Sequence, residues 1–102
     1  MLKEKPVPPK ETLIFTVNLS RSAEKFLDRL PDKHFGQIDR RLEMLKTNPR
    51  PHDSIQLTDR NKERRFDVGE YRVLYEIDDD IRIVDVFKIA PRKDKRIYKK
   101  RS

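Results

Sequence analysis

The fold is decided by the stretch Arg64-Arg65-Phe66-Asp67-Val68-Gly69-Glu70-Tyr71-Arg72-Val73-Leu74-Tyr75-Glu76-Ile77-Asp78. This stretch predicts two short strands joined by a tight turn at Gly69 and Glu70. The second strand carries β-branched and aromatic residues at alternate positions, namely Tyr71, Val73, Tyr75 and Ile77. Because successive side chains of a strand point to opposite faces, we expect Arg72 on the face away from those apolar residues.

Apolar periodicity on the N-terminal side of this hairpin predicts one strand and two helices. Alternation over residues 13–19 predicts the strand, and Ser20 is a candidate N-cap for a helix that Pro31 stops. A second helix is expected to begin at Asp32 and to end at Asn48-Pro49-Arg50-Pro51. The apolar stripes of the two helices are Ala23, Phe26, Leu27 and Leu30, followed by Phe35, Ile38, Leu42 and Leu45.

The segments around and after the hairpin complete an α+β fold. Ile55 and Leu57 are expected to be loop anchors or a short strand piece. After a turn at residues 78–80, residues 81–89 predict a long strand that is too apolar on both faces for an exposed edge, and Pro91 breaks it. The order is β-α-α-β-β-β. Because neither amphipathic helix is stable alone, we expect both to pack on one face of a small, mostly antiparallel twisted sheet.

Composition indicates one small, highly charged domain. Apolar residues make up 34% of the 102 residues and charged residues 42%, yet the apolar positions are periodic. The net charge is +7, and residues 88–101 hold eight Lys or Arg against one Asp, so the excess charge lies there. This tail is either a contact for a polyanion such as RNA or DNA, or a solvated basic segment. Residues 1–11 contain three prolines and are expected to be a flexible arm, with residues 12–102 as the domain.

Several classes of chemistry have no support in the sequence. Cysteine is absent, and no HExxH motif, Gly-rich phosphate loop or nucleophile elbow occurs, so we expect no metal and no cofactor. His34 and His52 are isolated, and His34 is more simply a structural or solvated residue of the second helix. No signal peptide or membrane span is visible, so a cytoplasmic protein without membrane contact is expected.

The residues that remain for chemistry are Arg, Lys and Tyr. RNA can be cut without a metal when its own 2′-hydroxyl attacks the adjacent phosphate, provided that protons are transferred and cations stabilise the phosphorane. Arg suits the second task because it stays protonated and grips phosphate oxygens through two donors. A Tyr among cations is a candidate general base, since their charge lowers its pKa. The alternative is that Arg64, Arg65 and Arg72 line a solvated face and Tyr98 anchors the tail.

These residues closely resemble the RelE/ParE toxin superfamily. The resemblance rests on the hairpin motif GxYRVxYxID, on the long apolar strand after it, and on the ending Arg92-Lys93-Asp94-Lys95-Arg96-Ile97-Tyr98. It also takes in residues 45–49 and covers roughly residues 12–98. Members of this family are small bacterial or archaeal toxins of type II toxin–antitoxin pairs. The RelE branch cuts mRNA in the ribosomal A site, whereas the ParE branch poisons DNA gyrase.

The resemblance implies a set of site residues. Arg72 matches the strand Arg that contacts the scissile phosphate in the RelE branch, and Asp67 stands where that branch tends to carry a second basic residue. Asp94 also interrupts the basic tail. The implied catalytic residues are Arg65, Arg72, Arg92 and Tyr98. The candidates for the charge that Asp67 does not supply are Lys62 and Arg64, and with Lys93, Lys95 and Arg96 of the basic tail they are the expected RNA-binding residues.

Three hypotheses follow. The first is a metal-independent endoribonuclease toxin that cleaves mRNA on the ribosome, with a cognate antitoxin, the ribosome and mRNA as partners. The second is a non-catalytic ParE-like toxin that binds gyrase. The third is an inactive relative or a plain RNA-binding module. Tyr98 and Arg92 favour the first hypothesis, because a pure binding protein does not need a Tyr among cations. Asp67 favours the second or third.

Overall fold

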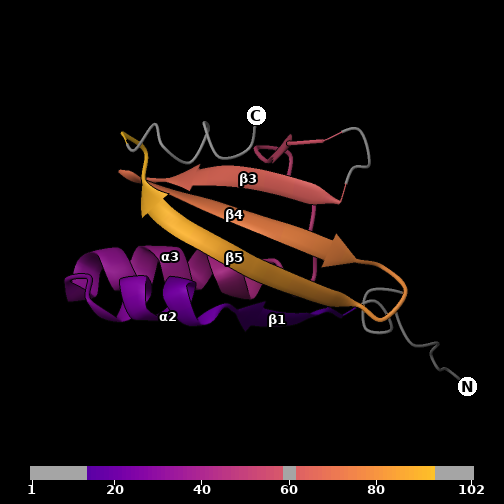
Figure 1. The fold of residues 1–102 in the computed structure, drawn as a ribbon, viewed down its shortest axis with the longest axis horizontal. Helices are drawn as coiled ribbons and strands as arrows, with labels where there is room; N and C mark the ends of the chain where they lie inside the picture. Colours follow the sequence, from indigo (N-terminus) through magenta and orange to yellow (C-terminus); the bar gives the residue numbers. More distant parts are fainter. Residues whose placement is uncertain (1–13, 59–61, 94–102) are drawn as a thin grey trace, which may run out of the picture.

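A five-stranded sheet organises the protein, with the strand order β1-β5-β4-β3-β2 (Figure 1). The structure, a computed structural model, describes residues 14–58 and 62–93, so the expected arm over residues 1–11 lies outside the described residues. The strands are β1 (Thr16–Leu19), β2 (Ile55–Gln56), β3 (Glu63–Val68), β4 (Tyr71–Asp78) and β5 (Ile83–Pro91), and the helices are α2 (Arg21–Asp28) and α3 (Asp32–Met44). Only the β1–β5 pairing is parallel, so the prediction of a mostly antiparallel α+β sheet is confirmed.

The two helices begin at the predicted signals, whereas α3 ends at Met44, four residues before the predicted stop at Asn48. The Ser20 hydroxyl accepts a hydrogen bond from the Ala23 backbone N–H at 3.1 Å, which satisfies one of the otherwise unpaired donors at the start of α2. Helix α2 ends at Asp28, before Pro31, and α3 begins at Asp32 as expected. The first strand is shorter than predicted, because β1 begins only at Thr16.

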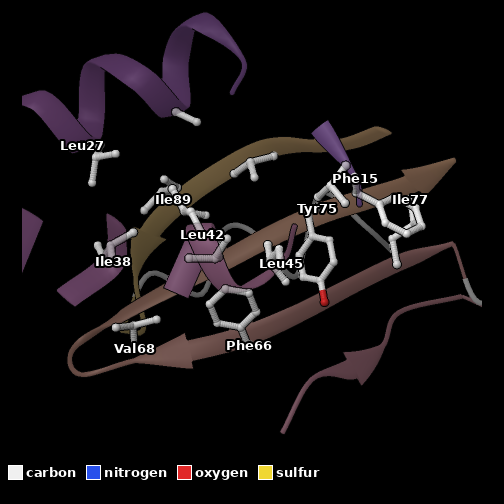
Figure 2. Packing of buried hydrophobic residues seen from close by; sticks show 14 residues of the cluster. Phe15, Leu27, Ile38, Leu42, Leu45, Phe66, Val68, Tyr75, Ile77 and Ile89 are labelled. Atoms are coloured by element: carbon white, nitrogen blue, oxygen red, sulfur yellow. The ribbon is translucent and has the colours of Figure 1, made fainter. Parts of the chain in front are cut away.

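The main core lies between the helices and one face of the sheet. Figure 1 shows α2 and α3 on the same side of the sheet. Figure 2 shows the helical side chains Leu27, Ile38, Leu42 and Leu45 directed toward Phe66, Val68, Tyr75 and Ile77 of β3 and β4. Ile38, Tyr75 and Ile77 are fully buried. The stripes predicted for both helices therefore form the core.

The hairpin turn has the geometry that its glycine predicts. Gly69 has a φ of 56°, in the left-handed region that favours glycine, and it joins β3 to β4 with Val68 paired to Tyr71. This two-residue turn fixes the register of the whole hairpin, so that Asp67 lies opposite Arg72.

The last strand is as long as predicted but shifted by two residues, so β5 begins at Ile83 and its last residue is Pro91. The backbone N–H of Arg92 donates to the Glu70 carbonyl at 2.9 Å, so the nitrogen of Pro91, one residue earlier, faces the other edge of β5. There β1 has already ended, since it pairs with β5 only over Ile83–Val86. Pro91 therefore costs the sheet no backbone hydrogen bond, and it is the last residue of β5 rather than a residue beyond the strand.

The face of the sheet away from the helices carries a smaller apolar cluster. Leu74 and Ala90 are buried there, and Leu57 and Phe87 pack against them. Phe87 is the extra residue of a β-bulge, because Lys88 pairs with Leu74 whereas Val86 pairs with Tyr75. We call this side of the sheet the open face. It also carries Arg72, as predicted.

Candidate phosphate-binding site

The open face brings three of the predicted arginines to one point. Asp67 on β3 pairs with Arg72 on β4, and Arg65 lies two residues before Asp67 on the same face. Arg92 follows the last residue of β5, which pairs with Tyr71 at the same end of the hairpin. Residues separated by up to 27 positions in the chain therefore meet beside the Gly69 turn. We call Arg65, Asp67, Arg72 and Arg92 the arginine cluster.

The carboxylate of Asp67 is the centre of the arginine cluster. Arg72 donates from Nε to Oδ1 of Asp67 at 2.7 Å and from Nη2 to Oδ2 at 3.2 Å, which is a two-point contact. Arg65 approaches less closely, with its Nη1 3.9 Å from Oδ1. Arg92 places its Nε 3.5 Å from Oδ2. All three guanidinium groups are thus within ion-pair distance of one carboxylate.

The side chains of the arginine cluster differ in their exposure to solvent. The side chain of Arg72 is only 10% exposed, whereas that of Arg92 is 52% exposed and that of Asp67 is 34% exposed. Arg92 also donates from Nη1 to the Gly69 carbonyl at 3.2 Å, on the turn that closes the hairpin. Arg72 is therefore part of the interior, while Arg92 and Asp67 face solvent.

The charges of the arginine cluster perturb one another. The hydrogen bond from Arg72 holds the pKa of Asp67 below its usual range, with further help from the nearby charges of Arg72, Arg92 and Arg65. Burial, together with the charge of Arg72, lowers the pKa of Arg65. Asp67 is therefore ionised near neutral pH, and a cluster of three arginines and one carboxylate carries a formal charge of +2.

This arrangement suits binding of an oxyanion better than proton transfer. Guanidinium groups on β3, on β4 and just after β5 lie close enough together to hold the oxygens of one phosphate. Asp67 is a poor general base, because a lowered pKa weakens its attraction for a proton. A proton-transfer group must come from elsewhere, and the predicted candidate, Tyr98, lies outside the described residues together with Lys95 and Arg96.

The remaining predicted residues are not brought into the arginine cluster. Arg64 alternates with Arg65 and lies on the helix side, where its Nε donates to Oγ of Ser54 at 2.8 Å and its Nη2 donates to the Ser54 carbonyl at 3.1 Å. Lys62 and Lys93 are exposed, before β3 and after β5. The idea that Arg64 supplies charge beside Arg65 is therefore not supported by this geometry.

Two relationships were not anticipated from the sequence. Asp67 departs from a position that is basic in the RelE branch, and its pairing with Arg72 follows from the two-residue turn. His34, expected to be structural or solvated, places Nδ1 2.8 Å from the Tyr71 hydroxyl, and Phe26 packs edge-on against the same tyrosine. His34 therefore links α3 to β4 on the helix side, a contact that no local pattern indicates.

Two further observations concern metal sites and membrane spans in the described residues. Across residues 14–58 and 62–93, no three His, Cys, Asp or Glu side chains gather into a candidate metal site. Neither helix in this part of the chain combines the length and apolar character that crossing a membrane requires.

The fold is similar to that of solved RelE toxins. The archaeal RelE–RelB complex from Pyrococcus horikoshii is 22% identical, with a TM-score of 0.69 over 79% of this chain and 98% of that one. The RelBE2 toxin–antitoxin complex from Mycobacterium tuberculosis is 23% identical, with a TM-score of 0.66 over 78% and 99%. The isolated E. coli RelE toxin is 16% identical, with a TM-score of 0.67 over 84% and 93%. At these identities the likeness establishes the fold.

The family itself is established by sequence. The comparison with curated proteins gave no match. A family model described as "ParE toxin of type II toxin-antitoxin system, parDE" matches residues 17–96, which include both helices, the sheet and the arginine cluster. The chain therefore belongs to the ParE toxin family of type II toxin–antitoxin systems, within the RelE/ParE superfamily.

Proposed function

We propose that this toxin is a metal-independent endoribonuclease that cleaves mRNA on the ribosome and so inhibits translation. The observation that carries the proposal is the convergence of Arg65 from β3, Arg72 from β4 and Arg92 from the end of β5 on one point of the open face. Cations fixed by neighbouring strands are suited to a phosphate whose negative charge grows during the reaction. The fold of the RelE toxins supports the same reading.

The reaction needs only the RNA and the side chains of the toxin. The 2′-hydroxyl oxygen attacks the adjacent phosphorus, its proton passes to a base, and the bond from phosphorus to the 5′-oxygen breaks. The leaving oxygen takes up a proton, and the products are a 2′,3′-cyclic phosphate and a 5′-hydroxyl end. Arg65 and Arg92 would stabilise the phosphorane, and Tyr98 would transfer a proton.

The proposal is tested by mapping mRNA 5′ ends in cells after induction of the toxin, with gyrase-linked DNA breaks measured in parallel. New ends that depend on translation and vanish in an Arg65→Gln variant are expected. Lys25→Gln is a suitable control, because it removes one exposed positive charge from α2, outside both the arginine cluster and residues 88–101. Arrested growth with DNA breaks and no new mRNA ends would contradict the endoribonuclease reading.

A second candidate function is inhibition of DNA gyrase without catalysis. Two observations favour it. Asp67 sits at the centre of the arginine cluster and lowers its charge from +3 to +2, which weakens any stabilisation of a phosphorane. The matching family model is also that of the ParE toxins. Under this hypothesis the arginine cluster stabilises the fold or binds a partner, and induction of the toxin produces gyrase-linked DNA breaks.

The proposed partners are an antitoxin protein, mRNA and the ribosome. Two of the similar structures are complexes of a toxin with its antitoxin. The net charge of +7 makes an acidic or amphipathic antitoxin segment the expected ligand. Expression of this chain alone should arrest growth, and co-expression of the neighbouring reading frame should relieve the arrest. Normal growth at verified expression of folded protein would count against a toxin that acts alone.

A further inference from the structure

Asp67 contacts the three arginines of the cluster at different distances. Arg72 is held at two points, at 2.7 and 3.2 Å, and is almost completely buried. The nearest contacts of Asp67 with Arg92 and Arg65 are 3.5 and 3.9 Å, longer than a well-formed charge-assisted hydrogen bond. The cluster therefore consists of one tight pair, Asp67–Arg72, and two guanidinium groups that are attached to the pair more loosely.

The anchoring of Arg92 allows its guanidinium to reorient without a change in the sheet. Its backbone N–H donates to the Glu70 carbonyl at 2.9 Å, which fixes the main chain beside the turn. Its side chain is half exposed and reaches both Asp67 and the Gly69 carbonyl. A change of side-chain rotamer is enough to move this guanidinium from the carboxylate to a ligand in solvent.

We propose that Asp67 is an internal competitor for the phosphate of the ligand. The carboxylate keeps Arg72, while the half-exposed Arg92 leaves it to hold a phosphate group that approaches from solvent beside Arg65. This assignment rests on the proposed function only in taking that phosphate to belong to RNA. It also changes the role of Arg72, which then holds Asp67 in place and does not contact the scissile phosphate.

The electrostatics of the site support competition rather than simple positioning. An ionised carboxylate resembles one edge of a phosphate in charge and in hydrogen-bonding geometry, and both are ligands for guanidinium groups. The low pKa of Asp67 keeps its negative charge in place near neutral pH, where it repels an incoming phosphate. Removal of this charge should therefore strengthen phosphate binding, whereas a positioning role predicts the opposite.

The first test uses the unchanged protein and inorganic phosphate, which cannot be cleaved. Nitrogen-15 NMR at about pH 6 follows the Nε–H signals of the three arginines during the titration. We expect the signals of Arg65 and Arg92 to shift with phosphate, while that of Arg72 stays in place because its pair with Asp67 persists. A shift of the Arg72 signal as large as that of Arg92, or no shift of any of the three, would overturn the proposal.

The second test compares Asp67→Asn with Glu76→Gln. Both substitutions remove one negative charge, but Glu76 is exposed at the far end of β4 and has no part in the arginine cluster. The probe is a fluorescent single-stranded DNA oligonucleotide, which lacks the 2′-hydroxyl needed for cleavage. Asp67→Asn should bind the oligonucleotide about tenfold more tightly. The slope of log binding constant against log salt concentration should become steeper by roughly 0.7, the change expected for one added phosphate contact.

The control should bind within about twofold of the unchanged protein, because its charge is distant and screened. Equal or weaker binding by a folded Asp67→Asn variant would show that the carboxylate positions the arginines. If Asp67→Asn does not fold, the phosphate titration of the unchanged protein decides alone. Both tests measure binding and not cleavage, so absence of mRNA cleavage in cells would refute the endoribonuclease proposal without deciding this one.

Discussion

Asp67 and Arg72 face each other across β3 and β4 and are joined by two hydrogen bonds of 2.7 and 3.2 Å. The pair lies on the open face of the sheet, with the Arg72 side chain 10% exposed beside the buried Leu74 and Ala90. A buried charge is tolerated only with a partner, so this pair is a structural element of the sheet as well as part of the arginine cluster.

The first prediction concerns the stability that this pair provides. Arg72→Ala should lower the free energy of unfolding by about 1.5–3 kcal/mol, the usual range for hydrogen bonds to a charged group. Arg92→Ala removes a half-exposed arginine from the same carboxylate and should cost less than about 1 kcal/mol. Chemical denaturation of both variants gives the comparison. Equal losses would mean that burial does not distinguish the two arginines.

The second prediction concerns pH. The pKa of Asp67 is lower in the folded chain than its usual value, chiefly because of the hydrogen bond from Arg72. The stability that its charge contributes is therefore present above the unfolded pKa, about 3.9, and is lost as pH falls through the folded pKa. The difference in unfolding free energy between the unchanged protein and Asp67→Asn should shrink as the pH falls below about 4.

Asp79 requires a control in that experiment. Its pKa is also lowered, first by the hydrogen bond from Arg50, which contacts both carboxylate oxygens at 3.1 and 2.9 Å. An Asp79→Asn background removes this contribution, and the effect of Asp67→Asn should remain. A stability difference for Asp67→Asn that does not change between pH 7 and pH 3 would contradict the assigned shift.

The third prediction uses the two glycines, which should respond to the same substitution with opposite sign. Gly69 has a φ of 56°, so Gly69→Ala places a β-carbon in the left-handed region at a cost of about 1–2 kcal/mol. Gly36 lies inside α3 with open space around the position of an added β-carbon, so Gly36→Ala should stabilise by about 0.5–1 kcal/mol. Thermal unfolding of the pair checks both signs.

Much of the fold follows from local signals. Ser20 caps α2 because a hydroxyl before an amphipathic stripe satisfies a helix donor, and Gly69 closes the hairpin because the turn needs a positive φ. Pro91 is the last residue of β5 rather than the residue beyond it, because a proline is excluded from a strand only where a neighbouring strand needs its N–H. That neighbour depends on where β1 ends, which is a tertiary fact.

The arginine cluster was predictable only in part. The opposition of Asp67 and Arg72 follows from counting outward from a two-residue turn. The position of Arg92 beside Asp67 depends on the bulge at Phe87 and on the path of β5 past the turn. No local sequence pattern predicts either feature. Arg64 was grouped with Arg65 by adjacency, although neighbouring residues of a strand point to opposite faces.

The last prediction separates binding from chemistry at the proposed active site. Arg65→Gln and Arg92→Gln each remove a cation from the position where a phosphorane would gain charge. Each should lower mRNA cleavage by about a hundredfold or more, the usual loss for one preorganised donor. Tyr98→Phe should lower cleavage by a comparable factor while RNA binding stays nearly unchanged, because the hydroxyl serves proton transfer and not affinity.

Single-turnover cleavage on programmed ribosomes, together with binding of a 2′-deoxy oligonucleotide, distinguishes these outcomes. The two arginine variants should weaken both binding and cleavage, whereas Tyr98→Phe should weaken cleavage alone. If Tyr98→Phe cleaves normally, the proton acceptor is another group and the role assigned to Tyr98 is wrong. If all three variants arrest growth as strongly as the unchanged toxin, the arginine cluster is not the source of toxicity. Inhibition of gyrase through a different surface then becomes the better account.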